Sequence, residues 1–243
     1  LWFAATADGR SKVAIDSARK AASRVDDETL KAVPLLAGFR VVPYFALTRF
    51  GKWDDMLREL EPPGSSAYLR GQWHYARGTA FLGKGQLTEA EQEIAKLKEI
   101  MADKSLDQPL FSPNTGRSIL SIAEEVLAGE IAAAKKDYSQ AVSHLERAVR
   151  LEDALVYTEP AEFHYPPRHA LGAVLLAANR APEAETVYWE DLRRNRENGW
   201  ALYGLMQALK AQSKNEDAAL VEARLKKAWA RADVPLTASR FGR

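Results

Sequence analysis

A glycine followed by an alanine twelve residues later recurs three times, and this fixed interval is the strongest constraint on what the chain can fold into. The pairs are Gly78 and Ala90, Gly129 and Ala141, and Gly172 and Ala184. A polar break separates the members of each pair, at residues 83–86, 135–137 and 179–182. Small residues on two adjacent helices let the helix backbones approach closely. We therefore expect each pair to mark one helical hairpin in which the glycine faces the alanine.

Helical periodicity in residues 138–151 supports this interpretation. The apolar positions of this segment fall on one face of a helix, while the opposite face is polar. The apolar stripe consists of Ala141, Val142, Leu145, Ala148 and Val149. A generic helical bundle with coincidental small residues is the alternative, but it does not explain three equal intervals with turn residues in each gap.

The same rule finds weaker copies near both ends of the chain. These copies pair Trp2 with Ala14, Tyr44 with Met56, and Gly204 with Ala218. The last pair spans fourteen residues rather than twelve, so its register differs from that of the others.

Aromatic residues, Leu-Gly and alanine at fixed offsets in units of about 34 residues resemble the tetratricopeptide repeat (TPR). The best matches are Leu171-Gly172 with Leu175 and Ala184, and Gly78 with Phe81 and Ala90. The resemblance covers nearly the whole chain. It implies an all-α, right-handed superhelical solenoid of antiparallel helix hairpins, with five to six degenerate repeats in one unit over residues 1–243. Two departures are Arg196 where a proline often closes the unit and Asp191 where alanine is usual.

Residues 42–54, 73–78, 159–172 and 190–204 also resemble a group of uncharacterised bacterial TPR proteins. Such proteins are typically longer and often carry an export signal, and this chain opens at Leu1 in a segment typical of the end of a helix. The resemblance implies the C-terminal part of a longer protein and favours the bacterial periplasm or envelope over the cytoplasm. It implies no activity.

TPR proteins that grip chaperone C-termini clamp a carboxylate with Lys and Asn on the concave face of the first helices. At the matching places this sequence has Tyr75 and Thr79, Val126 and Glu130, and His169 and Ala173. The clamp is missing, which argues against a chaperone-tail adaptor.

Composition excludes several classes of function. The absence of cysteine rules out disulfides, thiolate zinc sites, iron–sulfur clusters and cysteine nucleophiles. Lys and Arg number 34 against 33 Asp and Glu, so the chain lacks the net positive charge of a non-specific nucleic-acid binder. No apolar run approaches the ~20 residues of a membrane span. We expect neither nucleic-acid binding nor membrane insertion.

Catalytic and cofactor motifs are also absent from the sequence. It contains no Gly-rich phosphate loop, no Gly-x-Ser-x-Gly and no His-Glu-x-x-His, so we expect no enzyme and no cofactor. His164 and His169 lie five residues apart with two prolines between them, which is not the spacing of a helical metal-ligand pair. A small-molecule or metal-ion binding protein remains an alternative, because histidine and aromatic residues cluster around Tyr165.

The sequence predicts a protein- or peptide-binding scaffold that uses the concave face formed by the first helices. The partner-binding residues expected there are Phe45, Arg49, Gln72, Tyr75, Thr79, His169 and Leu205. The alternative is a structural segment of a larger repeat protein or homo-oligomer, because Leu1, Trp2 and Phe3 would leave apolar side chains at an open end.

A second candidate set combines arginines with aromatic residues: Trp73, Arg77, Phe163, Tyr165 and Arg168. A partly buried arginine must pair with a carboxylate or stack on a ring. The set therefore forms either internal salt bridges, for Arg168 to Glu159 or Glu162, or a groove that grips a peptide.

Residues 106–116 and 153–167 lengthen the repeat period, and a third loop spans residues 61–66. Proline and glycine mark all three as loops. Insertions in repeat arrays often line the binding surface. We expect the tail after Ala232 to fray or to lie over the last helix.

Overall fold

The computed structural model describes residues 1–62, 66–110 and 113–240, and these residues form an all-helical fold. The helices are α1 (Trp2–Ala7), α2 (Ser11–Ala22), α3 (Asp27–Ala32), α4 (Ala37–Arg40), α5 (Val42–Arg49), α6 (Trp53–Arg58), α7 (Ala67–Gly83), α8 (Leu87–Ile100), α9 (Gly116–Ala134), α10 (Tyr138–Asp153), α11 (Pro167–Ala177), α12 (Ala181–Arg194), α13 (Gly199–Ala211) and α14 (Asn215–Ala228), with short 3-10 turns η1 (Pro34–Leu36) and η2 (Lys104–Asp107). Apart from one isolated bridge between Pro109 and Thr115, the described residues contain no β structure. The all-α prediction is confirmed.

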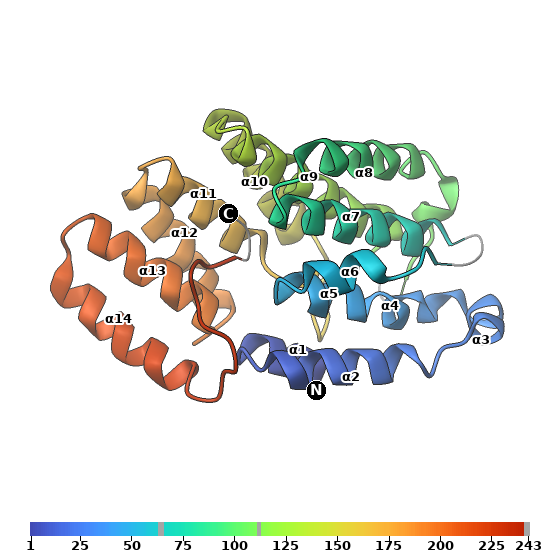
Figure 1. The fold of residues 1–243 in the computed structure, drawn as a ribbon, viewed down its shortest axis with the longest axis horizontal. Coiled ribbons are helices and arrows are strands. Elements are labelled where there is room, and N and C mark those ends of the chain that lie inside the picture. Colours follow the sequence, from blue (N-terminus) through green and yellow to red (C-terminus); the bar gives the residue numbers. More distant parts are fainter. Residues whose placement is uncertain (63–65, 111–112, 241–243) are drawn as a thin grey trace.

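The helices pack as consecutive pairs (Figure 1). The pairs in contact are α1 with α2, α5 with α6, α7 with α8, α9 with α10, α11 with α12, and α13 with α14. Neighbouring pairs also touch through their first helices, as α7 touches α9 and α11 touches α13. Most of the buried apolar side chains form one cluster that runs along the whole array.

The repeated glycines leave room for large side chains from neighbouring helices. A Cβ atom on Gly129 would lie 2.6 Å from Leu145 and 3.2 Å from the carbonyl oxygen of Ala141. A Cβ atom on Gly172 would lie 2.4 Å from the ring of Tyr188. Leu145 and Tyr188 each lie four residues, or about one helical turn, after the alanine of the pair. In both pairs the glycine therefore contacts this large side chain on the second helix.

Gly78 differs, because its nearest neighbour is Leu127 of the following helix pair, at 2.6 Å from an added Cβ atom. The nearest neighbour of each glycine is thus a large side chain, and only for Gly129 is the alanine of the pair among the three nearest contacts. The three alanines are fully buried. The interval thus indicates close helix packing correctly, but large side chains make the contact.

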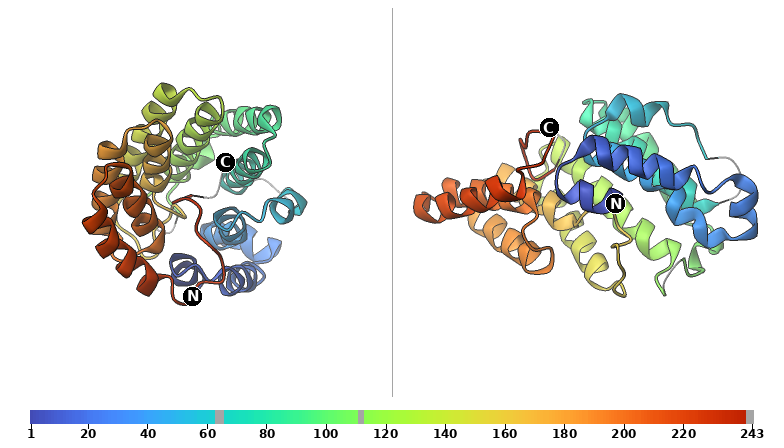
Figure 2. Two further views of the ribbon diagram at one scale, coloured as in Figure 1. Left: turned by 60° about the vertical axis from the view of Figure 1, so that its left-hand side comes forward. Right: turned by 90° about the horizontal axis from the view of Figure 1, so that it is seen from below.

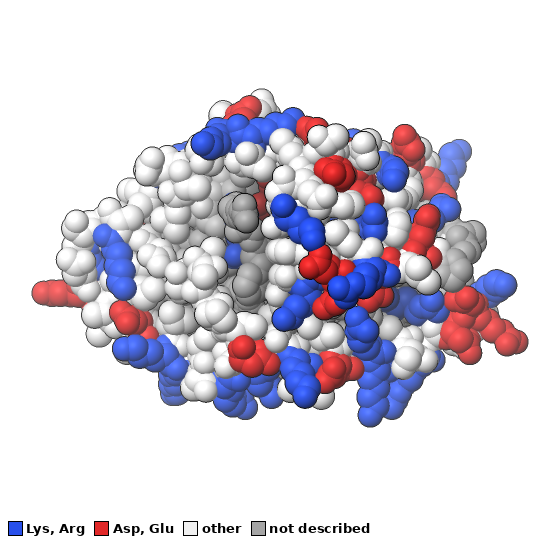
Figure 3. Space-filling view, viewed as in Figure 1, with Lys and Arg blue, Asp and Glu red and all other residues white. Residues whose placement is uncertain are grey.

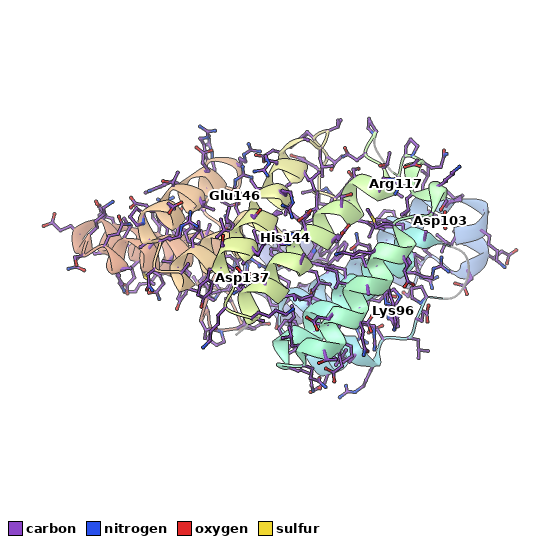
Figure 4. The ribbon with its side chains drawn as sticks, turned by 90° about the horizontal axis from the view of Figure 1, so that it is seen from above. Lys96, Asp103, Arg117, Asp137, His144 and Glu146 are labelled. Carbon is purple, nitrogen blue, oxygen red and sulfur yellow. The ribbon has the colours of Figure 1, made fainter. Side chains whose placement is uncertain are left out.

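Two helix pairs share a contact between a histidine and a glutamate, but the two residue types exchange helices. His74 on α7 contacts Glu93 on α8 at 2.5 Å, and Glu125 on α9 contacts His144 on α10 at 2.6 Å. Each α7 or α9 partner lies four residues before the repeated glycine, and each α8 or α10 partner lies three residues after the repeated alanine. Figure 4 shows His144 midway along α10. The two pairs therefore share one internal register, as the spacing predicts.

The array curves until its two ends meet (Figure 2). Trp200 on α13 packs in a separate apolar cluster with Ala5, Ala14 and Phe50 from the first helices. Its indole N–H donates a hydrogen bond to the carbonyl oxygen of Thr6 at 3.2 Å. The helices therefore form a ring in which α13 and the segment after α14 lie against α1 and α2.

Asp233 fastens the segment after α14 to the start of α2. Its carboxylate accepts hydrogen bonds from the backbone N–H groups of Ser11 (2.6 Å) and Lys12 (3.1 Å), and its own N–H donates to Gly9 (3.1 Å). The first N–H groups of a helix have no partner within the helix, and Arg10, which precedes α2, supplies no side-chain cap. Burial alone would raise the pKa of Asp233, but these backbone donors lower it, so the cap is anionic.

The predicted course of the tail is wrong. Residues 229–240 leave α14 and cross the interior of the ring (Figure 2). The loops predicted at residues 61–66 and 106–116, and the end of the tail, lie partly outside the described residues, at 63–65, 111–112 and 241–243. In the described part of the chain, every helix is too short or too polar to cross a membrane.

Replacing Gly172 with alanine should destabilise the fold. The fully buried ring of Tyr188 lies between Gly172 and Gly204, where added Cβ atoms would lie 2.4 and 2.1 Å from it. Overpacking of this kind costs about 1–3 kcal/mol, more than the ~1 kcal/mol that alanine gains over glycine in a helix. Urea unfolding of G172A should show this loss. In a Y188L background, where the ring is gone, G172A should cost less than in the unaltered chain, and an unchanged free energy of unfolding for G172A would contradict the packing.

Candidate functional site

Arg49 of α5 lies at the centre of the ring interior and is 3% exposed. Its guanidinium lies over the rings of Trp200 (3.7 Å to the centroid) and Tyr165 (4.7 Å). Its Nη2 donates to Nδ1 of His169 at 2.9 Å. No carboxylate of the described residues is within ion-pair distance of this guanidinium. A charge so placed needs another form of compensation.

A neutral His169 links Arg49 to a buried carboxylate. Because its Nδ1 accepts from Arg49, its Nε2 carries the proton and donates to Asp191 at 2.9 Å. Burial lowers the pKa of His169 despite the nearby Asp191. Asp191 also accepts from the amides of Asn195 (3.0 Å) and Asn198 (2.9 Å). Burial would raise the pKa of Asp191, but His169 and the two amides lower it. A buried positive and a buried negative charge thus balance across a neutral ring.

Burial lowers the pKa of Arg49 to about 9, against its ordinary value of 12.5. The guanidinium therefore stays charged at neutral pH. Stacking on Trp200 and Tyr165 offsets part of the cost of removing this charge from water, because the faces of aromatic rings attract cations. The centre of the ring therefore holds a buried cation whose charge is balanced by Asp191 through His169.

His164 lies among aromatic side chains beside Arg49. Its imidazole stacks on Phe45 (4.6 Å between centroids) and lies edge-on to Tyr75 (5.7 Å) and Tyr165 (4.5 Å). Neither ring nitrogen has a hydrogen-bond partner among the described residues. Burial, and to a lesser extent the charge of Arg49, hold the pKa of His164 well below its ordinary 6.5. His164 is therefore a neutral ring with unsatisfied polar atoms, which is uncommon in a folded protein.

A pocket of about 660 Å³ opens beside this cluster. Its walls come from α1, the ends of α10 and α12, and the loop before α11. At its edge, Arg168 binds both carboxylate oxygens of Asp153 at 2.8 and 2.6 Å and contacts Glu152 at 3.4 Å. The prediction that Arg168 pairs with Glu159 or Glu162 is therefore wrong. Burial raises the pKa of Glu152 to about 8, although Arg168 lowers it.

The tail also lies in the ring interior. From residue 231 to 238 its residues are alternately exposed and half-buried, and Ser239 and Arg240 are buried. A period of two is typical of an extended chain with one face on a surface. In Figure 3 the molecular surface is hollowed between α11–α13 on the left, where few charged side chains lie, and α5–α7 on the right, where both signs gather. We call the interior surface that contacts residues 231–240 the tail groove.

The structure brings together four of the seven residues predicted to bind a partner: Phe45, Arg49, Tyr75 and His169. These four are buried, as are Gln72 and Leu205, while Thr79 is half-buried and donates to the carbonyl oxygen of Tyr75 at 3.0 Å. Their role in partner binding stays a prediction, since other parts of the same chain cover them.

The arginine and aromatic set divides into three places, of which the ion pairs of Arg168 with Asp153 and Glu152 are one. Phe163 and Tyr165 belong to the interior cluster. Arg77 instead lies over the ring of Trp73 (4.5 Å) and contacts Glu93 at 3.3 Å, between α7 and α8. It also donates to the carbonyl oxygen of Leu57 on α6 at 3.2 Å. Arg77 therefore joins three helices and does not face the groove.

Sequence reasoning missed the residues whose partners lie far along the chain. Trp200 reaches the first helices, and Ser239 reaches α11 and α12, neither of which a local pattern indicates. Asp191 did leave a signal, because it stands seven residues after Ala184, where the matching residues of two other helix pairs are Leu97 and Ala148. Such a departure marks a buried polar network inside the array.

Replacing Asp191 with asparagine should cost on the order of 2–4 kcal/mol of stability, because loss of one partner leaves the charge of Arg49 uncompensated in the interior. Urea unfolding at pH 7 measures this loss. Glu190→Gln on the same helix is the control, since Glu190 pairs with Arg193 at the surface and should cost less than ~1 kcal/mol. Equal losses for the two variants would contradict the network.

His164 should make the protein less stable in mild acid. The unfolded chain takes up a proton near pH 6.5, whereas the folded chain keeps His164 neutral, so the unfolded state binds more protons and stability falls as pH falls. Between pH 7 and 5.5 the unaltered chain should lose ~1 kcal/mol more than His164→Leu. Urea unfolding at both pH values tests this. The control Phe163→Leu, in the same cluster, should show the same pH dependence of stability as the unaltered chain. If His164→Leu also showed that pH dependence, His164 would not be its source.

No protein-family model, curated protein or solved structure matches this chain. A proposal about function therefore rests on the geometry of the ring interior.

Proposed function

We propose that this chain is a TPR-like α-solenoid that binds a peptide segment of a partner protein in the tail groove. The observation that carries the proposal is the chain's own tail, which lies in this groove as a non-helical segment with alternating burial. An irregular segment held against helices in this way has the geometry of a bound peptide.

The residues that hold the tail support this function. Arg49 on α5, Glu130 on α9 and His169 on α11 each contact Ser239 or Arg240. These three helices are the first helices of three different pairs. Stacked repeats expose equivalent helices on one curved surface, which is the surface that such proteins use for binding. The tail therefore lies where a partner of a repeat array is expected.

The tail must also compete with any partner. A segment tethered to its own binding site has an effective concentration on the order of millimolar. A partner peptide therefore binds only if its affinity is high enough to displace the tail, or if the contacts of the tail are weakened. Two of the residues predicted to face a partner, Arg49 and His169, are hydrogen-bonded to Ser239 of the tail. Binding a partner would expose and then cover the same side chains.

The pocket beside His164 supports a second candidate, a small-molecule binding protein. Its volume of about 660 Å³ is within the usual range for such ligands. Arg49 Nε and both nitrogens of His164 have no hydrogen-bond partner among the described residues, and a rearrangement that exposed them would suit a small carboxylic acid. Within the described ranges, no group of three or more His, Cys, Asp or Glu residues could hold a metal ion.

Panning a peptide library against the full-length chain tests the main proposal. The contacts of the tail are weakened in the variant Ser239→Ala/Arg240→Ala. Peptides enriched on this variant should bind to it at least tenfold more tightly than they bind to the unaltered chain, because the tail no longer competes with them. Fluorescence anisotropy of labelled peptides gives the dissociation constants, and circular dichroism confirms that the variant is folded.

The bound peptides should be displaced by a synthetic peptide of residues 233–240. Failure of both forms of the chain to enrich any peptide would refute the proposal. If small carboxylic acids instead raised the melting temperature, the pocket beside His164 would become the leading candidate.

A further inference from the structure

Ser239 is held by groups that require a hydroxyl. It is 2% exposed. Its Oγ donates to the carbonyl oxygen of His169 at 2.7 Å and pairs with the hydroxyl of Tyr188 at 2.8 Å. Since the single proton of Ser239 goes to His169, Tyr188 is the donor in the second bond. The carbonyl oxygen of Ser239 accepts from Arg49 at 3.4 Å. The serine thus contacts α5, α11 and α12 together.

Arg240 is held by a carboxylate on a fourth helix. It is 8% exposed and forms an ion pair with Glu130 of α9. The side chain of Glu130 is 14% exposed, so this pair is largely shielded from water. A buried carboxylate without its cation is costly, which makes Glu130 selective for a positively charged residue at this point. The guanidinium fork matches a carboxylate better than an ammonium group does.

Resting on the proposed function, we propose that the tail groove recognises a serine followed by an arginine in a partner peptide. Ser239 and Arg240 are the chain's own copy of this motif. Both are buried, whereas residues 231–238, which precede them, are at most half-buried. Specificity therefore concentrates in the two anchored residues, while the preceding residues contribute apolar contact on one face only.

The chemistry of the groove defines which substitutions it rejects. Alanine in place of the serine would leave the hydroxyl of Tyr188 without its partner in a buried place. Alanine in place of the arginine would leave the Glu130 carboxylate unpaired. Neighbouring positions should tolerate change, because Thr237 is exposed and Ala238 is only half-buried.

Displacement of the tail from the full-length chain tests the recognition. The chain has no cysteine, so Thr237→Cys provides one exposed position for a fluorophore. An acetylated and amidated peptide of residues 233–240 should displace the tail and lower the anisotropy of the fluorophore in a saturable way. Peptides with alanine at the serine or at the arginine should need at least tenfold higher concentrations.

Glu130→Gln in the labelled chain is the second measurement. It should lower the anisotropy before any peptide is added, because Arg240 loses its anchor. Glu124→Gln is the matched control, since Glu124 lies on the same helix and only contacts Lys98 at 3.9 Å. Circular dichroism shows whether each variant remains folded.

Equal displacement by all three peptides would overturn recognition of the Ser–Arg pair and leave peptide binding by the groove intact. Unchanged anisotropy in Glu130→Gln would overturn the role of Glu130. Library peptides that bind the groove without a Ser–Arg pair would likewise refute this inference alone. Failure of every peptide, including the library, would remove the proposed function as well.

Discussion

The buried guanidinium of Arg49 is the interaction on which the ring interior depends. A positive charge at this depth is stable only when its surroundings are arranged for it. Here α13 supplies the ring of Trp200, the loop before α11 supplies Tyr165, and α11 supplies His169, which passes the interaction to Asp191. Because each partner comes from a different part of the chain, satisfying Arg49 fixes how the first and last helix pairs approach one another.

Closure of the ring changes what a repeat array can do. An open array leaves the inner faces of its first helices exposed to solvent, whereas here Asp233 caps α2 and the tail continues into the interior. The cap and the buried Ser239 hold the tail at two separated points, so residues between them need few contacts of their own. A tail held in this way blocks access to the groove only through non-covalent contacts, which can be broken.

The inner faces of the first helices also show how small sequence changes redirect recognition. Tyr75 and His169 lie three residues before a repeated glycine, and Glu130 lies one residue after another. A carboxylate clamp of the chaperone-tail type needs Lys and Asn at such places, and this chain has neither there. Here Glu130 reverses the charge and contacts an arginine. A carboxylate at this place favours a cationic ligand, as the proposed Ser–Arg recognition requires.

Local pattern alone determined that this chain is helical and where several helix pairs begin and end. Turn residues and apolar stripes act within a few residues, so the interval from Gly129 to Ala141 predicts a close helix contact without knowledge of the rest. Only the tertiary structure decided that the ends meet, that Asp191 compensates Arg49 through His169, and that Ser239 and Arg240 fill the interior. The contacts that close the ring join residues up to 224 positions apart, as Asp233 and Gly9 are. No periodicity encodes them, because they depend on how far the whole array curves.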